Sequence, residues 1–173
     1  MYTIDDLDTI TELIDVPRCS TGAPCPAIIS AEHFLHLAYY LEEQDEWDGK
    51  TVRFENRQRS DERCAVVRFQ GVGSYTFGIP DENSLEGHPL YGRGLRHYRF
   101  SEVKNSSWVR AIQRIDSFDS QFNPKRFANL RHLIFPFHDS TFECVANSFE
   151  LYIERGFVSD VLRASCKNSW LSG

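Results

Sequence analysis

Hydrophobic and polar positions alternate along much of the chain after residue 26, which is the pattern of β-strands. The run HFLHLAYYLEE, residues 33–43, is largely apolar on both alternating faces and therefore predicts a central strand that is covered on both sides. Shorter runs rich in β-branched and aromatic residues predict further strands at 27–30, 51–57, 63–71, 73–80 and 96–103.

Two segments in the first two thirds of the chain follow helical spacing instead. Apolar residues at positions 4, 7, 10, 13 and 14 predict a short acidic helix over Ile4–Ile14, which a proline-rich loop over Val16–Pro26 would end. The best helical pattern runs from an N-cap at Ser106 or Ser107 to Phe118, with Trp108, Ile112 and Ile115 along one face.

The last third of the chain supports two interpretations over residues 141–155. A helix is suggested by a capping box formed by Ser140 and Glu143 and by a stop at Gly156. Two strands are suggested by the many β-forming residues and by apolar residues at every second position, Phe149, Leu151 and Ile153. We favour the strands, followed by a short terminal helix that Ser159 caps.

These elements predict the fold class. A chain of 173 residues buries roughly 70% of its unfolded surface and needs one hydrophobic core. No repeat or linker divides it, so we expect a single domain over residues 1–173. The expected fold is α+β, with a mainly antiparallel sheet of about eight strands folded into a sandwich, two or three short helices, and the Ser106–Phe118 helix packed on one face.

The stretch RHLIFPFHDSTFECV, residues 131–145, contains the candidate chemistry. If a hairpin turns at Asp139–Ser140, Cys144 lies opposite Phe135 and is a buried hydrophobic residue. If the turn extends through Thr141, Cys144 moves to the histidine face, near His138. The register of the hairpin therefore decides whether this stretch is reactive or structural.

An enzyme is one hypothesis for this stretch. Cys144 as nucleophile, His138 as base and Asp139 as the orienting acid would make a small hydrolase or transferase, with His88 as a second candidate histidine. Adjacent strand residues point to opposite sides, which weakens the contact between His138 and Asp139. The sequence has no HExxH, HxH or CxxC motif, and we expect neither a metal nor a cofactor.

Charge points to a protein partner. Residues 1–50 hold eleven acids and two bases, a balance of −9, whereas residues 51–173 hold fourteen acids and seventeen bases, a balance of +3. Such separation either steers a charged partner or is offset when the two parts pack together. The expected contact residues lie in the acidic first third and in the long, glycine-punctuated 80–95 loop: Asp45, Glu46, Trp47, Asp48, His88 and Tyr91.

The stretch YGRGLRHYRF suggests an anion site. Arg93, Arg96 and Arg99 alternate with aromatic residues, the combination that holds a nucleotide or a single strand of nucleic acid. Strand alternation would divide the arginines between two faces, and the formal net charge of −6 disfavours nucleic acid. Pairing with the acidic first third is the simpler expectation for these arginines.

These observations favour a binding protein. Five cysteines without CxxC spacing, an acidic start and no long apolar run predict a reduced, cytoplasmic protein that no membrane segment anchors. The leading hypothesis is a protein-binding module, of which a toxin-neutralising immunity protein or a regulatory protein is the concrete version. Unpaired sheet edges are compatible with a homodimer.

Overall fold

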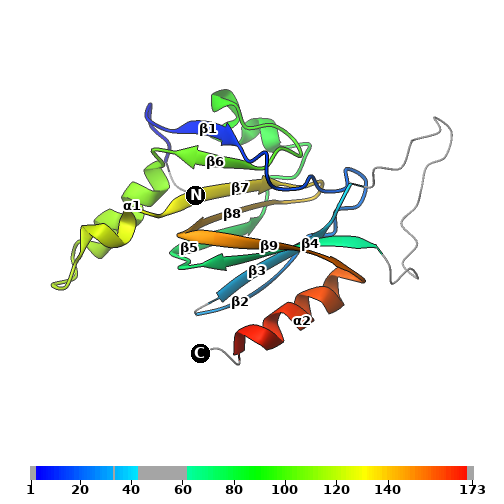
Figure 1. Ribbon diagram of the computed structural model, residues 1–173. Coiled ribbons are helices and arrows are strands. Elements are labelled where there is room, and N and C mark those ends of the chain that lie inside the picture. The colour runs from blue at the N-terminus through cyan, green and yellow to red at the C-terminus, as the bar shows by residue number, and fades with distance from the viewer. Residues whose placement is uncertain (1–2, 33, 43–61, 171–173) are drawn as a thin grey trace.

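The structure, a computed structural model, describes residues 3–170 except residue 33 and residues 43–61. Two antiparallel sheets form its body (Figure 1). The five-stranded sheet has the order β1 (Thr9–Glu12), β6 (Ser101–Lys104), β7 (Arg131–Pro136), β8 (Thr141–Ala146), β5 (Ser74–Gly78). The four-stranded sheet has the order β2 (Ala27–Ala31), β3 (Phe34–Tyr40), β4 (Arg63–Gln70), β9 (Ser148–Arg155). The predicted α+β sandwich is confirmed.

Two helices and three short 3-10 turns complete the described chain. They are α1 (Ser107–Asp116), α2 (Val158–Trp170), η1 (Leu85–Gly87), η2 (Tyr91–Arg93) and η3 (Pro124–Phe127). The helix α2 packs along β3 and β2, whereas α1 touches β7 and extends beyond the sheets (Figure 1). Neither helix of the described chain combines the length and apolar character that crossing a bilayer requires.

The hydrophobic core fills the space between the sheets. The inward residues of β3 and β4 face those of β7 and β8, and Phe69 of β4 contacts the rings of both Phe135 and Phe142. Each sheet also buries residues on its outer face. The 80–95 loop covers Val103 and Ile134 of the five-stranded sheet with buried leucines, and α2 covers part of the four-stranded sheet.

The predicted helix over Ile4–Ile14 is wrong, because β1 forms there and pairs with β6. The apolar spacing does not form one buried face, since Ile14 is 86% exposed while Ile10 packs against the leucines of the 80–95 loop. Tertiary strand pairing outweighs a weak helical pattern in a segment with two β-branched threonines, Thr9 and Thr11.

Other boundaries also differ from the predictions. Only the end of the 96–103 segment joins β6, because Tyr98 adopts a positive φ of 56° that interrupts an extended chain. The cap at Ser106 is confirmed by its hydrogen bond from the Val109 amide. The helix α2 begins at Val158, so Ser159 lies inside its first turn. The strand predicted at 51–57 lies outside the described residues.

The two strands predicted over residues 141–155 are confirmed as β8 and β9. The hairpin formed by β7 and β8 turns at His138–Asp139, where the Phe137 amide donates to the Ser140 carbonyl. Cys144 therefore lies opposite Leu133, and both predicted registers are wrong. The sequence Asp139–Ser140 contains neither the glycine nor the asparagine that marks a two-residue turn, so the sequence does not predict the position of the turn.

Candidate functional site

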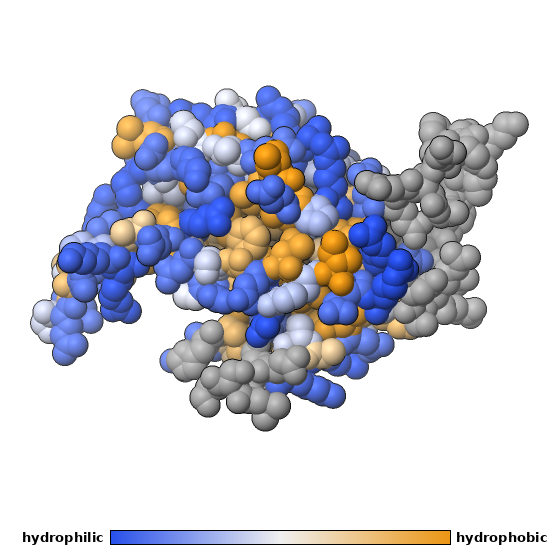
Figure 2. Space-filling view, viewed as in Figure 1, coloured by the Kyte–Doolittle hydropathy of each residue, from blue (hydrophilic) through white to orange (hydrophobic). Residues whose placement is uncertain are grey.

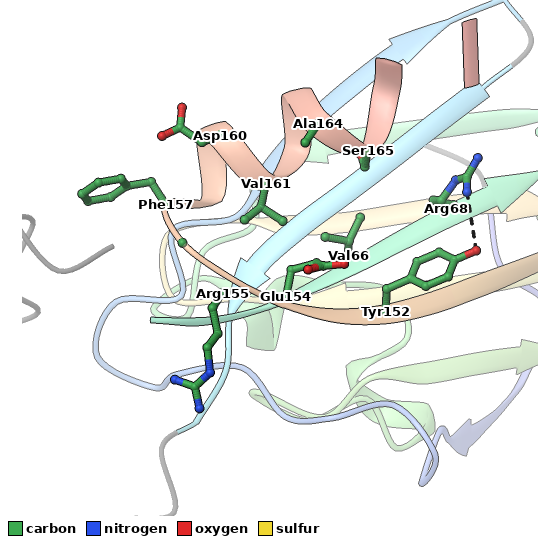
Figure 3. A pocket seen from close by; sticks show the side chains of 11 residues that line it. Val66, Arg68, Tyr152, Glu154, Arg155, Phe157, Asp160, Val161, Ala164 and Ser165 are labelled. Carbon is green, nitrogen blue, oxygen red and sulfur yellow. Dashed lines mark hydrogen bonds between the residues drawn. The ribbon is translucent and has the colours of Figure 1, made fainter. Parts of the chain in front are cut away.

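A groove crosses the outer face of the four-stranded sheet, between β9 and α2 (Figure 3). It exists because α2 packs mainly on β3 and β2 and leaves the outer faces of β4 and β9 partly uncovered. Its volume is about 550 Å³, within the range of natural ligand sites. Val66 of β4 and Val161 of α2 give it an apolar lining, while Arg68, Tyr152 and Glu154 give it polar groups.

The polar groups of the groove are unequally paired. The Arg68 guanidinium lies 5.8 Å from the Tyr152 ring centroid and 4.0 Å from a carboxylate oxygen of Glu150. The Tyr152 hydroxyl donates to Glu150 at 2.5 Å. The side chain of Glu154 points into the groove, and none of the hydrogen bonds or ion pairs seen in the described chain involves its carboxylate (Figure 3). Glu154 is therefore the available anionic group.

Behind the groove, His36 of β3 meets α2. Its Nδ1 lies 2.8 Å from Ser165 Oγ and 3.4 Å from Cys166 Sγ. Burial and, less strongly, the charge of Arg68 lower the pKa of His36 to about 4, and burial raises the pKa of the Cys166 thiol. Both groups are neutral near pH 7, so the pair lacks the thiolate of an activated nucleophile.

The strand β9 forms the open side of this groove. It spans eight residues and pairs with β4 alone among the described strands, so no described strand is hydrogen-bonded along its other edge. Phe149, Leu151 and Ile153 alternate along it with Glu150, Tyr152 and Glu154. In the space-filling view, hydrophobic residues gather in the middle of the face where β7, β8 and β9 lie, inside a hydrophilic surround (Figure 2).

A second polar cluster lies sealed under the 80–95 loop, on the outer face of the five-stranded sheet. Glu143 lies between two histidines, with one carboxylate oxygen 3.0 Å from His88 Nε2 and the other 2.9 Å from His132 Nε2. All three residues are buried. Burial alone would raise the pKa of Glu143, but the hydrogen bonds from His132 and His88 lower it to about 2.

The proton positions in this cluster follow from its outer contacts. The Leu90 amide donates to His88 Nδ1 at 3.1 Å, so the proton of the neutral ring is on Nε2 and points at Glu143. Ser106 Oγ lies 2.9 Å from His132 Nδ1 and assigns the same tautomer to that ring when its hydroxyl donates. A metal would need the Nε2 lone pair that the proton occupies. In the part of the chain that the structure describes, no group of histidine, cysteine and acidic residues is arranged to hold a metal ion.

The structure does not bring the alternative catalytic residues together. Cys144 is fully buried in the core between the sheets, and burial raises the pKa of its thiol well above the ordinary value. It lies opposite Leu133, five residues from His138, or about 16 Å along a strand. Asp139 lies 3.8 Å from His138 Nε2, but the nucleophile is absent from that end of the sheet.

His138 instead joins two residues that the sequence patterns did not single out. Its Nδ1 lies 3.1 Å from a carboxylate oxygen of Glu82 and 3.0 Å from the Tyr98 hydroxyl, which itself donates to Glu82. The Tyr98 hydrogen bond lowers the pKa of Glu82, and burial followed by the Glu82 contact raises the pKa of Tyr98. This half-exposed cluster ties the 80–95 loop to the hairpin turn.

The three arginines of the predicted anion site each have a partner within the chain. Arg93 pairs with Asp6 at 2.9 Å, and Arg99 pairs with Glu12 at 2.7 Å. Arg96 lies over the Tyr91 ring, 5.5 Å from its centroid. Two of them therefore pair with the acidic first third of the chain, as the simpler expectation had it.

The predicted partner-binding residues are divided. Asp45, Glu46, Trp47 and Asp48 lie outside the described residues. His88 is buried in the sealed cluster, and the Tyr91 hydroxyl donates to Glu86 at 3.2 Å on the exposed side of the 80–95 loop. The loop buries Leu85, Leu90 and Leu95, so its inner side is part of the core and only its outer side is exposed.

The groove residues Arg68, Tyr152 and Glu154 were not found from the sequence. Their strands were predicted, but whether a helix covers a sheet face depends on where α2 docks, which no local pattern indicates. Comparison with family models, with curated proteins and with solved structures finds no match for this chain.

Proposed function

We propose that this protein is a protein-binding module that holds another protein at the exposed edge of β9 and the adjoining groove. The observation that carries the proposal is the eight-residue edge strand beside a partly uncovered sheet face. Natural sheets usually shorten, charge or cover such edges, and an open edge is a ready site for an added strand.

The state of the reactive residues supports binding over catalysis. The cysteine of the alternative hydrolase is in the core, and the thiol and imidazole behind the groove are both neutral near pH 7. Two of the three arginines of the alternative anion sensor form ion pairs with acids of the first third. Neither alternative has an assembled site among the described residues.

The concrete version of the proposal is a cytoplasmic immunity or regulatory protein that neutralises or controls its partner. The formal net charge of −6 suits a basic partner, and five cysteines that form no disulfide suit a reducing compartment. The outer side of the 80–95 loop and the acidic residues Asp45, Glu46 and Asp48 stay in the proposal as a second contact surface.

Affinity capture from the cells that naturally make the protein tests this function. We expect one partner at a stoichiometric level, and a defined complex when both purified proteins are mixed and measured by light scattering. Changing Asp45, Glu46 and Asp48 to lysine should weaken that complex if the second surface contributes. Failure to recover any partner that re-forms a complex from purified components would contradict the proposal.

A further inference from the structure

We infer that β9 recognises an extended partner segment in which apolar residues alternate with basic ones, added as a fifth strand to the four-stranded sheet. This inference rests on the proposed function and specifies the chemistry of the partner. It follows from the difference between the two faces of β9, because a strand added at an edge places its alternate side chains on opposite faces of the sheet.

The first face of β9 selects apolar residues. Phe149 and Leu151 are half-buried and pack against the core between the sheets, while Ile153 is 46% exposed at the end of that row. Directly opposed side chains on neighbouring strands lie in contact, so apolar side chains of an added strand would cover this row. Burial of the exposed part of Ile153 favours binding.

The second face selects basic residues. Glu154 carries the available carboxylate there, whereas Glu150 already accepts a hydrogen bond from Tyr152 and lies 4.0 Å from Arg68. A lysine or arginine side chain that crosses β9 can lay its aliphatic part on Tyr152, Val66 and Val161 and place its charge at Glu154. An acidic side chain in the same place would meet like charge.

The spacing of the two acids sets the spacing in the partner. Glu154 sets one basic position in the matching segment, and Glu150, four residues away on the same face and partly neutralised by Arg68, sets a second and weaker one. The residues of the segment that point to the opposite face are apolar. The same argument disfavours a second copy of this chain as the occupant. Pairing β9 with another β9 would bring acidic rows together, which destabilises a sheet.

The test uses a fluorescent peptide with the sequence Val-Lys-Val-Thr-Val-Lys-Val and a matched peptide with glutamate in place of both lysines. Fluorescence anisotropy should show binding of the lysine peptide and at least about tenfold weaker binding of the glutamate peptide. Amide hydrogen exchange should show new protection in β9 when the lysine peptide is bound, because strand addition pairs its free backbone groups.

Two charge-reversal variants test whether binding of the lysine peptide depends on the groove or on the overall acidity of the protein. Glu154→Lys should weaken binding of the lysine peptide about tenfold, while Glu32→Lys, the same charge change next to β2 at the opposite edge of the sheet, should change it less than about twofold. Circular dichroism and thermal unfolding confirm that both variants fold. Ile153→Lys should also weaken binding, since it places a charge on the apolar face.

Several results would overturn the inference. The first is that the lysine peptide does not bind, and the second is that Glu32→Lys weakens its binding as much as Glu154→Lys does. The third is that N-acetyl-lysine amide binds with the same affinity as the lysine peptide. The fourth is that the chain associates with itself through β9. If a natural partner is captured but binds Glu154→Lys and Ile153→Lys as well as it binds the unchanged protein, the inference fails while the proposed function stands. If no partner is captured although the peptide binds, the proposed function fails instead.

Discussion

The two sheets each carry a glutamate on their outer face, and the surroundings of these two residues differ. Glu143 on the five-stranded sheet is buried beneath the 80–95 loop, and each of its oxygens accepts a hydrogen bond from a histidine. Glu154 on the four-stranded sheet points into the groove that α2 leaves uncovered. The first carboxylate is used inside the fold, while the second is available to a partner.

The comparison shows that the cover of a sheet face decides the role of a polar residue on it. The loop brings Leu85, Leu90 and Leu95 over one face and closes it, and His88 of the same loop donates a hydrogen bond to the carboxylate that is buried there. The helix α2 covers β2 and β3 but stops short of β9. Residue type alone does not distinguish the two glutamates.

The largest expected effect comes from changing Glu143 to glutamine. The amide would place an N–H group against the Nε2 proton of one histidine, and a buried pair that loses one partner is strongly destabilised. We expect the free energy of unfolding to fall by about 3 kcal/mol in urea titrations. Glu154→Gln is the matched control and should change it by less than about 0.5 kcal/mol. Similar losses in both variants would break the comparison.

The pH dependence gives a second view of the same residue. Because the folded protein lowers the pKa of Glu143 from 4.5 to about 2, its contribution to stability is present above pH 4.5 and is lost as the pH falls toward 2. The difference in unfolding free energy between the unchanged protein and Glu143→Gln should therefore shrink over that range. A constant difference would mean that the charge of Glu143 is not what stabilises the cluster.

The cysteines extend the comparison to reactivity. Cys25 is exposed, whereas Cys144 is fully buried and the pKa of its thiol is raised by burial. Iodoacetamide should therefore modify Cys25 at least about a hundredfold faster than Cys144 at pH 8, as peptide mapping by mass spectrometry would measure. Rapid labelling of Cys144 in the folded protein would restore the hydrolase hypothesis.

The histidine behind the groove should make the protein sensitive to mild acid. Burial and the charge of Arg68 lower the pKa of His36 from 6.5 to about 4, so the unfolded chain binds a proton that the folded protein does not. Stability should decrease as the pH falls from 6.5 to 4, by about 2 kcal/mol at pH 5. His36→Gln should remove most of this slope but leave the further loss of stability below pH 4, which Glu143 controls.

The fold could be predicted because its main signals are local. Alternation identified β3, β4, β5, β7 and β9, and a serine cap with an aromatic stripe identified α1. The errors fall where a distant contact decides the local structure. The segment over Ile4–Ile14 is a strand only because β6 lies beside it, and the turn at His138–Asp139 is set by pairing of the strands on both sides.

The site was less predictable because it depends on how faces are covered. Grouping Cys144 with His138 required Cys144 to lie opposite Pro136, yet a three-residue shift of register places it opposite Leu133, with the thiol and the imidazole far apart. The sequence suggests His88 as a candidate contact residue, but its partner Glu143 comes from a strand 55 residues away. Proximity of that kind becomes visible only when the 80–95 loop is packed on the sheet.

The smallest expected effect concerns charge pairs that are neither buried nor fully exposed to solvent. Arg99 and Glu12 are half-exposed and lie 2.7 Å apart, joining the acidic first third to the rest of the chain. Water screens such a pair, so a double-mutant cycle with alanine at both positions should give a coupling of about 0.5 kcal/mol that falls further at 1 M salt. A coupling as large as the effect at Glu143, or one that salt does not reduce, would mean that exposure is the wrong basis for separating structural from available charges. A weak, salt-sensitive coupling would place the contribution of Arg99 to stability between the large contribution of Glu143 and the small one of Glu154, as its half-exposed contact with Glu12 leads us to expect.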